Sequence, residues 1–217
     1  MMRRFISVVS VIFVVSVGFA SGAGAREVVN SSGSQEEISI NWDFSTEDGA
    51  FVFGSAQGIA PNGGEPFVTF FEQSVTEITC DNGTPDDTTD DFLGARVEFV
   101  NGSGPGTVDI DGRYRSGSAS AVLDLFVDSF DDCFFFPENG GGGTVIEDVP
   151  VSLSATATSS LIRSTSSSGF HIPSEVNENS RFDSRYRTGT GTATWGDNTQ
   201  TGFAQIGKTS WRFHSNS

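Results

Sequence analysis

Short runs of alternating apolar and polar residues recur along this chain from residue 38 onward, and Gly, Pro, Asn and Asp separate them. Alternation with a period of two places every second side chain on the same face of a β-strand. The runs use Val, Ile, Thr and Phe, which favour strands, and five Leu stand against 17 Phe after residue 25. No window beyond the first 25 residues shows the pattern of an amphipathic helix. The chain is therefore predicted to be all-β.

The spacing of these runs predicts an antiparallel sandwich or barrel of roughly ten short strands, in a single β domain over residues 38–217. Residues 26–37 are polar and are expected to form a flexible N-terminal lead. The expected strands cover residues 38–44, 50–55, 66–80, 95–101, 107–115, 118–128, 149–162, 181–187, 190–196 and 202–213.

Two segments of the chain resemble each other, which indicates an internal repeat. Residues 110–121 and 182–193 both read apolar, Asp, small residue, Arg-Tyr-Arg, hydroxyl residue and Gly. If the hydroxyl–Gly pairs at 116–117 and 188–189 are two-residue turns, each glycine supplies a positive φ and fixes the strand register. The repeat therefore predicts two related β-hairpins, each with one apolar and one polar face.

The first 25 residues have the features of a signal peptide. Arg3 and Arg4 precede an apolar stretch at residues 5–19, and Ala23 and Ala25 form a small-residue cleavage pattern. The apolar stretch is shorter than the ~20 residues that a membrane-spanning helix needs. We therefore expect cleavage after Ala25 and a secreted, extracellular protein, periplasmic if the host has an outer membrane. We expect no membrane span in the mature chain.

The charge of the chain limits its partners. Its 28 Asp and Glu residues outnumber 12 Lys and Arg residues, which gives a net charge of −16. Loss of residues 1–25 would leave ten basic residues and a net charge of −18. An acidic protein repels a phosphate backbone, and no basic stripe interleaved with aromatic residues is present. Nucleic acid is therefore not expected as a partner, and an extracellular surface or a glycan fits better.

Cys80 and Cys133 are the only cysteines, and in an exported chain they are predicted to form one disulfide. The bond would bring together two Asp-rich segments that contain Asp81, Asp131 and Asp132. Carboxylate oxygens in flexible loops are the ligands that Ca²⁺ prefers. Calcium is therefore one interpretation of these three residues, and a solvated acidic loop is the other.

Four arginines of the repeat form the second candidate site. Alternation places Arg113 and Arg115 on one strand face, and Arg185 and Arg187 on the corresponding face of the other copy. Guanidinium groups bind carboxylate or sulfate through two hydrogen bonds, so these residues are candidates for anion binding. Cross-strand ion pairs are the alternative interpretation.

Motifs of catalysis are few in this chain. There is no Gly-x-Ser-x-Gly, His-Glu-x-x-His or phosphate-binding loop, and His171 and His214 are the only histidines. No catalytic residue is predicted. The sequence favours a secreted, non-catalytic protein that binds an extracellular ligand or surface. The alternative is a β-sandwich carbohydrate-active enzyme that uses paired carboxylates.

Overall fold

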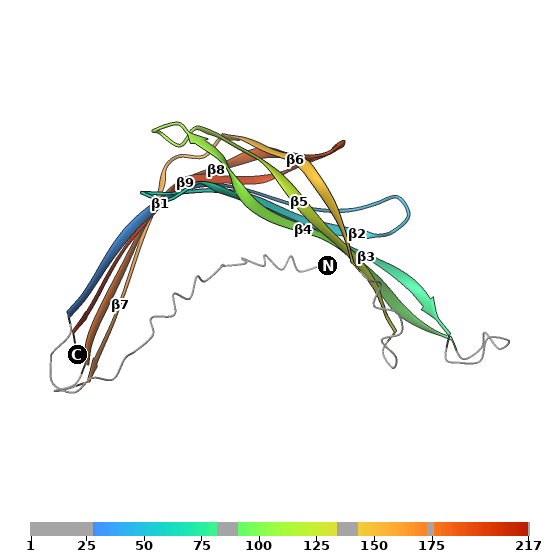
Figure 1. The fold of residues 1–217 in the computed structure, drawn as a ribbon, viewed down its shortest axis with the longest axis horizontal. Coiled ribbons are helices and arrows are strands. Elements are labelled where there is room, and N and C mark those ends of the chain that lie inside the picture. Colours follow the sequence, from blue (N-terminus) through green and yellow to red (C-terminus); the bar gives the residue numbers. More distant parts are fainter. Residues whose placement is uncertain (1–27, 82–90, 134–142, 173–175, 217) are drawn as a thin grey trace.

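The computed structural model describes residues 28–81, 91–133, 143–172 and 176–216. Within these ranges the chain forms nine antiparallel strands and no helix (Figure 1), which confirms the predicted all-β antiparallel class. No segment of these ranges forms a helix of the length and hydropathy needed to cross a bilayer. The predicted signal peptide, residues 1–25, lies outside the described ranges. The strands are β1 (Val28–Ser45), β2 (Phe51–Pro61), β3 (Phe67–Cys80), β4 (Phe92–Ile110), β5 (Ser116–Asp132), β6 (Thr144–Ala157), β7 (Ile162–Ile172), β8 (Val176–Trp195) and β9 (Asn198–Asn216).

The strands make a single sheet that closes on itself. Their order is β6-β5-β4-β3-β2-β1-β9-β8-β7, and β6 also pairs with β8. In this seam, Val151–Ala157 of β6 pairs with Gly189–Trp195 of β8. Eight strands therefore form a closed, barrel-like sheet, while β7 pairs with the other half of β8, from Val176 to Tyr186.

The inside of the closed sheet is packed with side chains from alternate strand positions. Ile38 and Ile40 of β1 are fully buried there. At one end of the closed sheet, the indole of Trp195 stacks on Trp42 with ring centroids 5.6 Å apart, and it lies 4.6 Å from the ring of Phe70. The buried cluster consists of Ile38, Ile40, Trp42, Ala56, Val68, Phe70, Ala119, Leu123, Leu125, Val151, Leu153, Ala155, Ala193, Trp195, Ala204 and Ile206.

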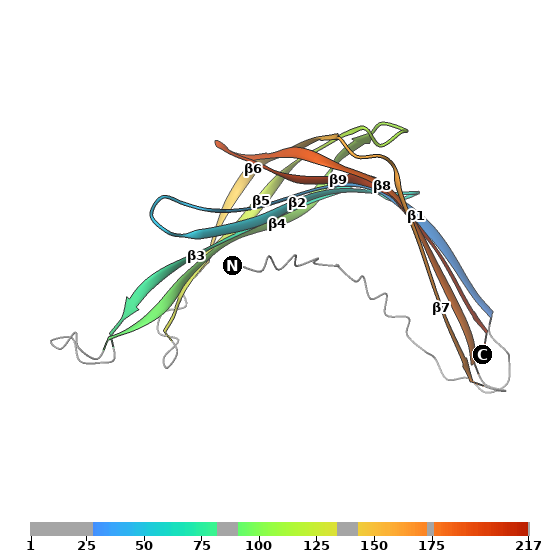
Figure 2. The same cartoon turned by 180° about the vertical axis from the view of Figure 1, so that it is seen from behind.

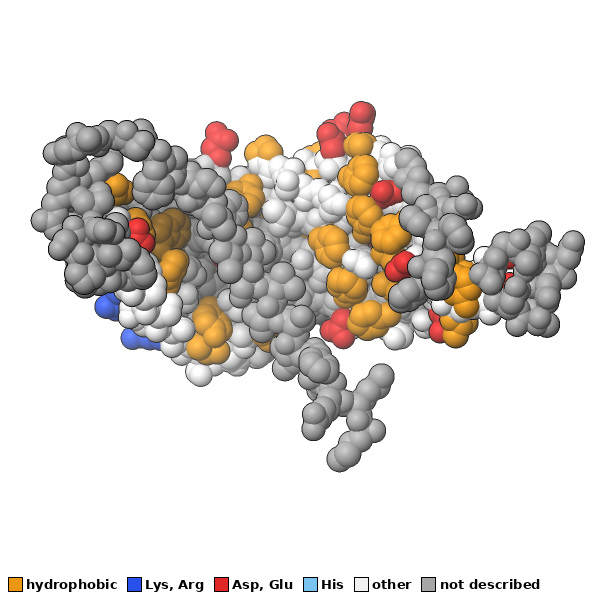
Figure 3. Space-filling view, turned by 90° about the horizontal axis from the view of Figure 1, so that it is seen from below, with side chains coloured by type: hydrophobic (Ala, Val, Ile, Leu, Met, Phe, Trp, Pro, Cys, Tyr) orange, Lys and Arg blue, Asp and Glu red, His pale blue; other side chains and the backbone are white. Residues whose placement is uncertain are grey.

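Several strands are longer than the closed sheet and continue beyond it as two arms. One arm contains the first part of β1, the last part of β9, the first part of β8 and all of β7. The other contains the last parts of β3 and β5 and the first part of β4. Both arms descend from the closed sheet, so the molecule has the shape of an arch (Figures 1 and 2). From below, hydrophobic side chains gather over the β3–β5 arm (Figure 3).

The strands are fewer and longer than the sequence predicted. Residues 28–37 were expected to lie in a flexible lead, but they belong to β1, which pairs with β9 from Val28 to Asn41. The expected strands at 95–101 and 107–115 lie largely in the single strand β4, and those at 181–187 and 190–196 in β8. Polar side chains do not end these strands, because at least one neighbouring strand continues to pair with the backbone at these positions.

The register predicted for the two hairpins is wrong. Ser116 and Gly117 begin β5, and the turn between β4 and β5 instead covers residues 111–115, with Ile110 opposite Gly117. In the other copy of the repeat no turn occurs at residues 188–189, because β8 runs straight through them. The turn that follows β8 lies between Trp195 and Asn198.

The glycines that the repeat placed at positive φ do not adopt it. Neither Gly117 nor Gly189 has a positive φ, whereas Tyr114 in the real turn has a φ of 57°. The ring of Tyr114 packs against the core, which compensates for its backbone conformation. Gly189 lies in the seam instead, where a Cβ atom would overlap the carbonyl oxygen of Thr156 in β6. Close approach of two strands therefore explains this glycine.

We predict that Gly189→Ala destabilises the protein by about 1–3 kcal/mol, because the added methyl group pushes β8 away from the backbone of β6. Gly112→Ala is the matched control, since nothing lies within 4 Å of the Cβ position at Gly112 and its φ is not positive. Urea unfolding followed by tryptophan fluorescence measures both variants. Equal unfolding midpoints for Gly189→Ala and the parent would contradict the seam geometry.

Candidate functional site

Arg187 joins two connections at the end of the closed sheet that faces the β7–β9 arm. Its Nε donates a hydrogen bond to the carbonyl oxygen of Arg113 at 2.9 Å, and its Nη1 donates to the carbonyl oxygen of Ser159 at 2.8 Å. The turn at residues 111–115 is thus held beside β8. Of the four arginines singled out by sequence, the structure brings Arg113 and Arg187 together directly.

Arg185 lies two residues before Arg187 on β8 and belongs to a larger group of basic side chains. Residues that pair directly across antiparallel strands point to the same side of the sheet, as do residues two apart in a strand. Arg163 of β7 pairs with Arg185, and Arg185 pairs with Lys208 of β9. Four residues away along each strand, a second row pairs Arg181 with Arg212. We call this group the basic face; it consists of Arg163, Arg181, Arg185, Lys208 and Arg212.

The basic face holds little negative charge. Asp183 accepts hydrogen bonds from Nε and Nη2 of Arg181 at 2.8 and 2.9 Å, and from Oγ1 of Thr165 at 2.8 Å. These bonds, that of Arg181 foremost, lower the pKa of Asp183 to about 2. Glu36 is opposite Lys208 in register but forms no ion pair with it. Within the described ranges, Arg181 is the only residue of the basic face that forms an ion pair.

Three pairs of like charges therefore lie directly opposite each other on this arm: Arg163 with Arg185, Arg185 with Lys208, and Arg181 with Arg212. Directly opposed like charges destabilise a sheet. Two such charges at ~5 Å in water repel each other by roughly 0.8 kcal/mol. A ligand that supplies negative charge would relieve this repulsion.

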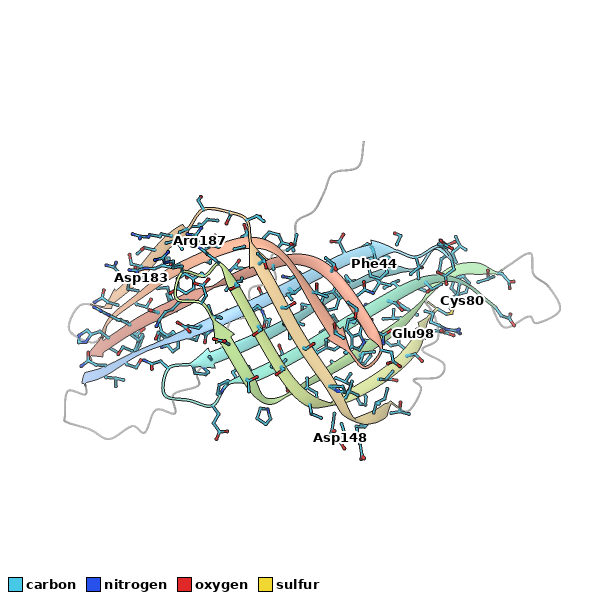
Figure 4. The ribbon with its side chains drawn as sticks, turned by 90° about the horizontal axis from the view of Figure 1, so that it is seen from above. Phe44, Cys80, Glu98, Asp148, Asp183 and Arg187 are labelled. Atoms are coloured by element: carbon cyan, nitrogen blue, oxygen red, sulfur yellow. A yellow bond between two sulfur atoms is a disulfide. The ribbon has the colours of Figure 1, made fainter. Side chains whose placement is uncertain are left out.

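The basic residues of the chain are concentrated at this end of the molecule. Figure 4 labels Asp183 and Arg187, both of β8, at the end of the molecule that carries the arm of β7, β8 and β9. The turn at residues 111–115 adds Arg113 and Arg115, both exposed. Eight of the ten Lys and Arg residues that follow residue 25 lie on the basic face, in this turn or at Arg187. The chain as a whole is acidic, so its positive charge is strongly segregated.

A pocket of about 510 Å³ lies beside the same turn. Its lining is rich in hydroxyl groups and carries the carboxylates of Asp109 and Asp111. Its threonines Thr190 and Thr192 have the opposite parity in β8 to Arg181 and Arg185, so the pocket lies on the other face of the sheet from the basic face. The lining residues are Asp109, Asp111, Ser116, Gly117, Ser118, Ser154, Ala155, Thr156, Thr190, Gly191, Thr192 and Thr201.

The predicted disulfide between Cys80 and Cys133 is confirmed and joins the ends of β3 and β5. It passes over Gly94 of β4, where a Cβ atom would overlap Sγ of Cys80. Cα atoms of the two cysteines are 5.8 Å apart, within the usual range for such a bond. The β3–β5 arm is thus covalently tied at its tip.

The three aspartates proposed as calcium ligands lie near this disulfide. Asp131 accepts hydrogen bonds from Nε and Nη2 of Arg96 at 2.7 and 3.0 Å, which lower its pKa. Asp81 and Asp132 are exposed. The described part of the chain contains no cluster of three or more His, Cys, Asp or Glu side chains arranged for a metal ion. Residues 82–90 lie outside it, so the calcium site stays a prediction.

Among the described residues, partial burial raises the pKa values of two carboxyl groups, Glu37 and Glu72. Glu72 accepts a hydrogen bond from Nε1 of Trp42 at 3.0 Å, so it satisfies a buried indole N–H at one end of the core. Glu37 occupies a position of opposite parity to Ile38 and Trp42, on the outer face of β1. The two groups therefore lie on opposite faces of the sheet and do not form the acid–base pair of a glycosidase.

Sequence reasoning missed half of the basic residues at this end. Arg163, Arg181, Lys208 and Arg212 lie on the basic face with Arg185, but only the strand register brings them together. The sequence offers one indication of the basic face. Every second residue from 181 to 187 is charged and so points to the same face of β8: Arg181, Asp183, Arg185 and Arg187.

We predict that Glu72→Gln raises the melting temperature at pH 7, because it removes a charge that folding must desolvate while keeping an acceptor for Trp42. Folding raises the pKa of Glu72 above 4.5. The parent therefore loses stability as the pH rises from the pKa of Glu72 in the unfolded chain through its pKa in the folded protein. Thermal unfolding between pH 4 and pH 7 should therefore show a widening gap between variant and parent. A gap that is constant over this range would contradict the raised pKa.

No family model, no curated protein and no solved structure matches this chain.

Proposed function

We propose that this protein is a secreted, non-catalytic binding module that holds an anionic extracellular polysaccharide against the basic face of β7, β8 and β9. The observation that carries the proposal is the set of directly opposed like charges on this arm, Arg163 with Arg185 and Lys208 above all. Such rows are unfavourable in the free protein, and negative charge from a ligand makes them favourable. The signal peptide expected at residues 1–25 is consistent with a role outside the cell.

The dimensions of the basic face favour a polymer over a single small anion. Strands lie ~4.8 Å apart and residues two apart along a strand are ~6.8 Å apart, so the five side chains cover an area of about 10 by 14 Å. One carboxylate or sulfate contacts one or two guanidinium groups at most. A chain with an anionic group on every sugar or every second sugar would contact several rows at once.

Sugar polymers suit this surface better than nucleic acid does. Binding of single strands uses aromatic side chains as stacking platforms next to the basic residues. On this arm the aromatic residues Phe182, Tyr186 and Trp211 occupy positions of the opposite parity, so they lie on the other face of the sheet.

The proposal predicts saturable binding to sulfated or carboxylated polysaccharides, with heparin and polygalacturonate as probes and neutral dextran as the negative control. Titration calorimetry should give binding that weakens steeply as salt screens the charges. Replacing both Arg185 and Lys208 with Ala should weaken binding by about tenfold, since two charge-assisted contacts are lost. Asp183→Asn should strengthen it, because the substitution removes the carboxylate from the basic face.

Arg96→Ala is the matched control, since it removes one positive charge from the other arm and should leave binding within twofold or so of the parent. Equal losses from Arg96→Ala and from an Arg185→Ala single variant would show that net charge alone governs binding and would refute the site. Equally strong binding to DNA at the same salt concentration would refute the preference for polysaccharide. Turnover of a glycoside substrate would refute the non-catalytic assignment.

A further inference from the structure

The outermost strand of the basic arm has a long unpaired edge. All 11 residues of β7 pair with β8, and among the described residues no other strand pairs with β7. An open edge presents a row of free N–H and C=O groups, and proteins usually protect it with proline, several charges or a bulge. β7 contains no proline, its only charged residue at neutral pH is Arg163, and its pairing with β8 has no register shift.

We propose that β7 pairs in antiparallel fashion with β7 of a second copy of this chain. The pairing would be centred on Ser167, the middle residue of the strand, so that Ile162 of one copy lies opposite Ile172 of the other. Each arm contributes β1, β9, β8 and β7, and the two arms would become one continuous eight-stranded sheet.

The sequence of β7 is self-complementary in this register. Arg163 comes opposite position 171 and not opposite the second Arg163, so no like charges meet across the interface. Ser166 comes opposite Ser168, and Ser167 opposite Ser167, and hydroxyl pairs of this kind stabilise neighbouring strands. The same contact already exists inside the monomer, where Oγ of Ser168 and Oγ of Ser180 are 2.6 Å apart.

This interface would enlarge the surface that we propose for polysaccharide binding. Only this enlargement rests on the proposed function, whereas the pairing of β7 with β7 does not. A two-fold axis between antiparallel strands is perpendicular to the sheet, so both basic faces would lie on the same side. Ten strand cations would then line one surface. A long polyanion that contacts both copies gains avidity without any new kind of contact.

The test is the oligomeric state of the full mature chain, measured by sedimentation velocity between about 1 and 100 µM. We expect a dimer that dissociates on dilution. Ser167→Lys should weaken it by about tenfold or more, because two Lys side chains would then face each other at the centre. Ser152→Lys is the matched control, since Ser152 is equally exposed but lies on β6 between β5 and β8.

Ser167→Cys gives a second measurement, which does not depend on weakening the dimer. Under oxidising conditions it should form a covalent dimer across the two-fold axis, whereas Ser152→Cys should not. A parent that stays monomeric at 100 µM, with and without heparin, would overturn the interface. A dimer that survives Ser167→Lys and does not crosslink through Ser167→Cys would overturn it as well. Heparin binding by a strictly monomeric parent would overturn the interface while leaving the proposed function intact.

Discussion

Pairing between β6 and β8 closes the sheet, and the rest of the architecture depends on it. The seam uses only the last seven residues of β8, from Gly189 to Trp195. The longer first part of this 20-residue strand is therefore left outside the closed sheet, where it pairs with β7 and β9. Without the seam, Ala155 and Leu153 of β6 would lose their partners in the core. The arm that carries the basic face thus exists because β8 is longer than the seam it forms.

Strand content and the disulfide were predictable from the sequence. Strands follow from the local alternation of apolar and polar residues, and the disulfide follows from the number of cysteines and the predicted signal peptide. Alternation identified the core strands from Ile38 onward, and a single pair of cysteines behind a predicted signal peptide favours a disulfide. Strand ends were less predictable, since polar residues such as those at 28–34 remain in β1 when β9 extends far enough to pair with them. Polarity alone does not end a strand whose backbone groups have partners.

The internal repeat shows why register escaped prediction. Asp111 accepts hydrogen bonds from the backbone N–H groups of Arg113 and Arg115, and this closes a turn. The equivalent Asp183 instead binds Arg181 and Thr165, because β7 lies alongside and supplies the threonine. Nearly identical residues thus form a turn in one copy and a straight strand in the other. The basic face was missed for the same reason, since it depends on which strands become neighbours.

Charge separation between the two arms has a kinetic consequence. The β3–β5 arm carries seven carboxylates and a single arginine, Arg96, within the described ranges, whereas the opposite arm carries the basic face. These carboxylates are those of Glu77, Asp81, Asp91, Glu98, Asp128, Asp131 and Asp132. A molecule with such a dipole rotates in the field of a polyanion before contact, so it meets the polymer with its basic end first. Electrostatic steering would thus select the orientation of encounter and leave the disulfide-tied arm pointing into solvent.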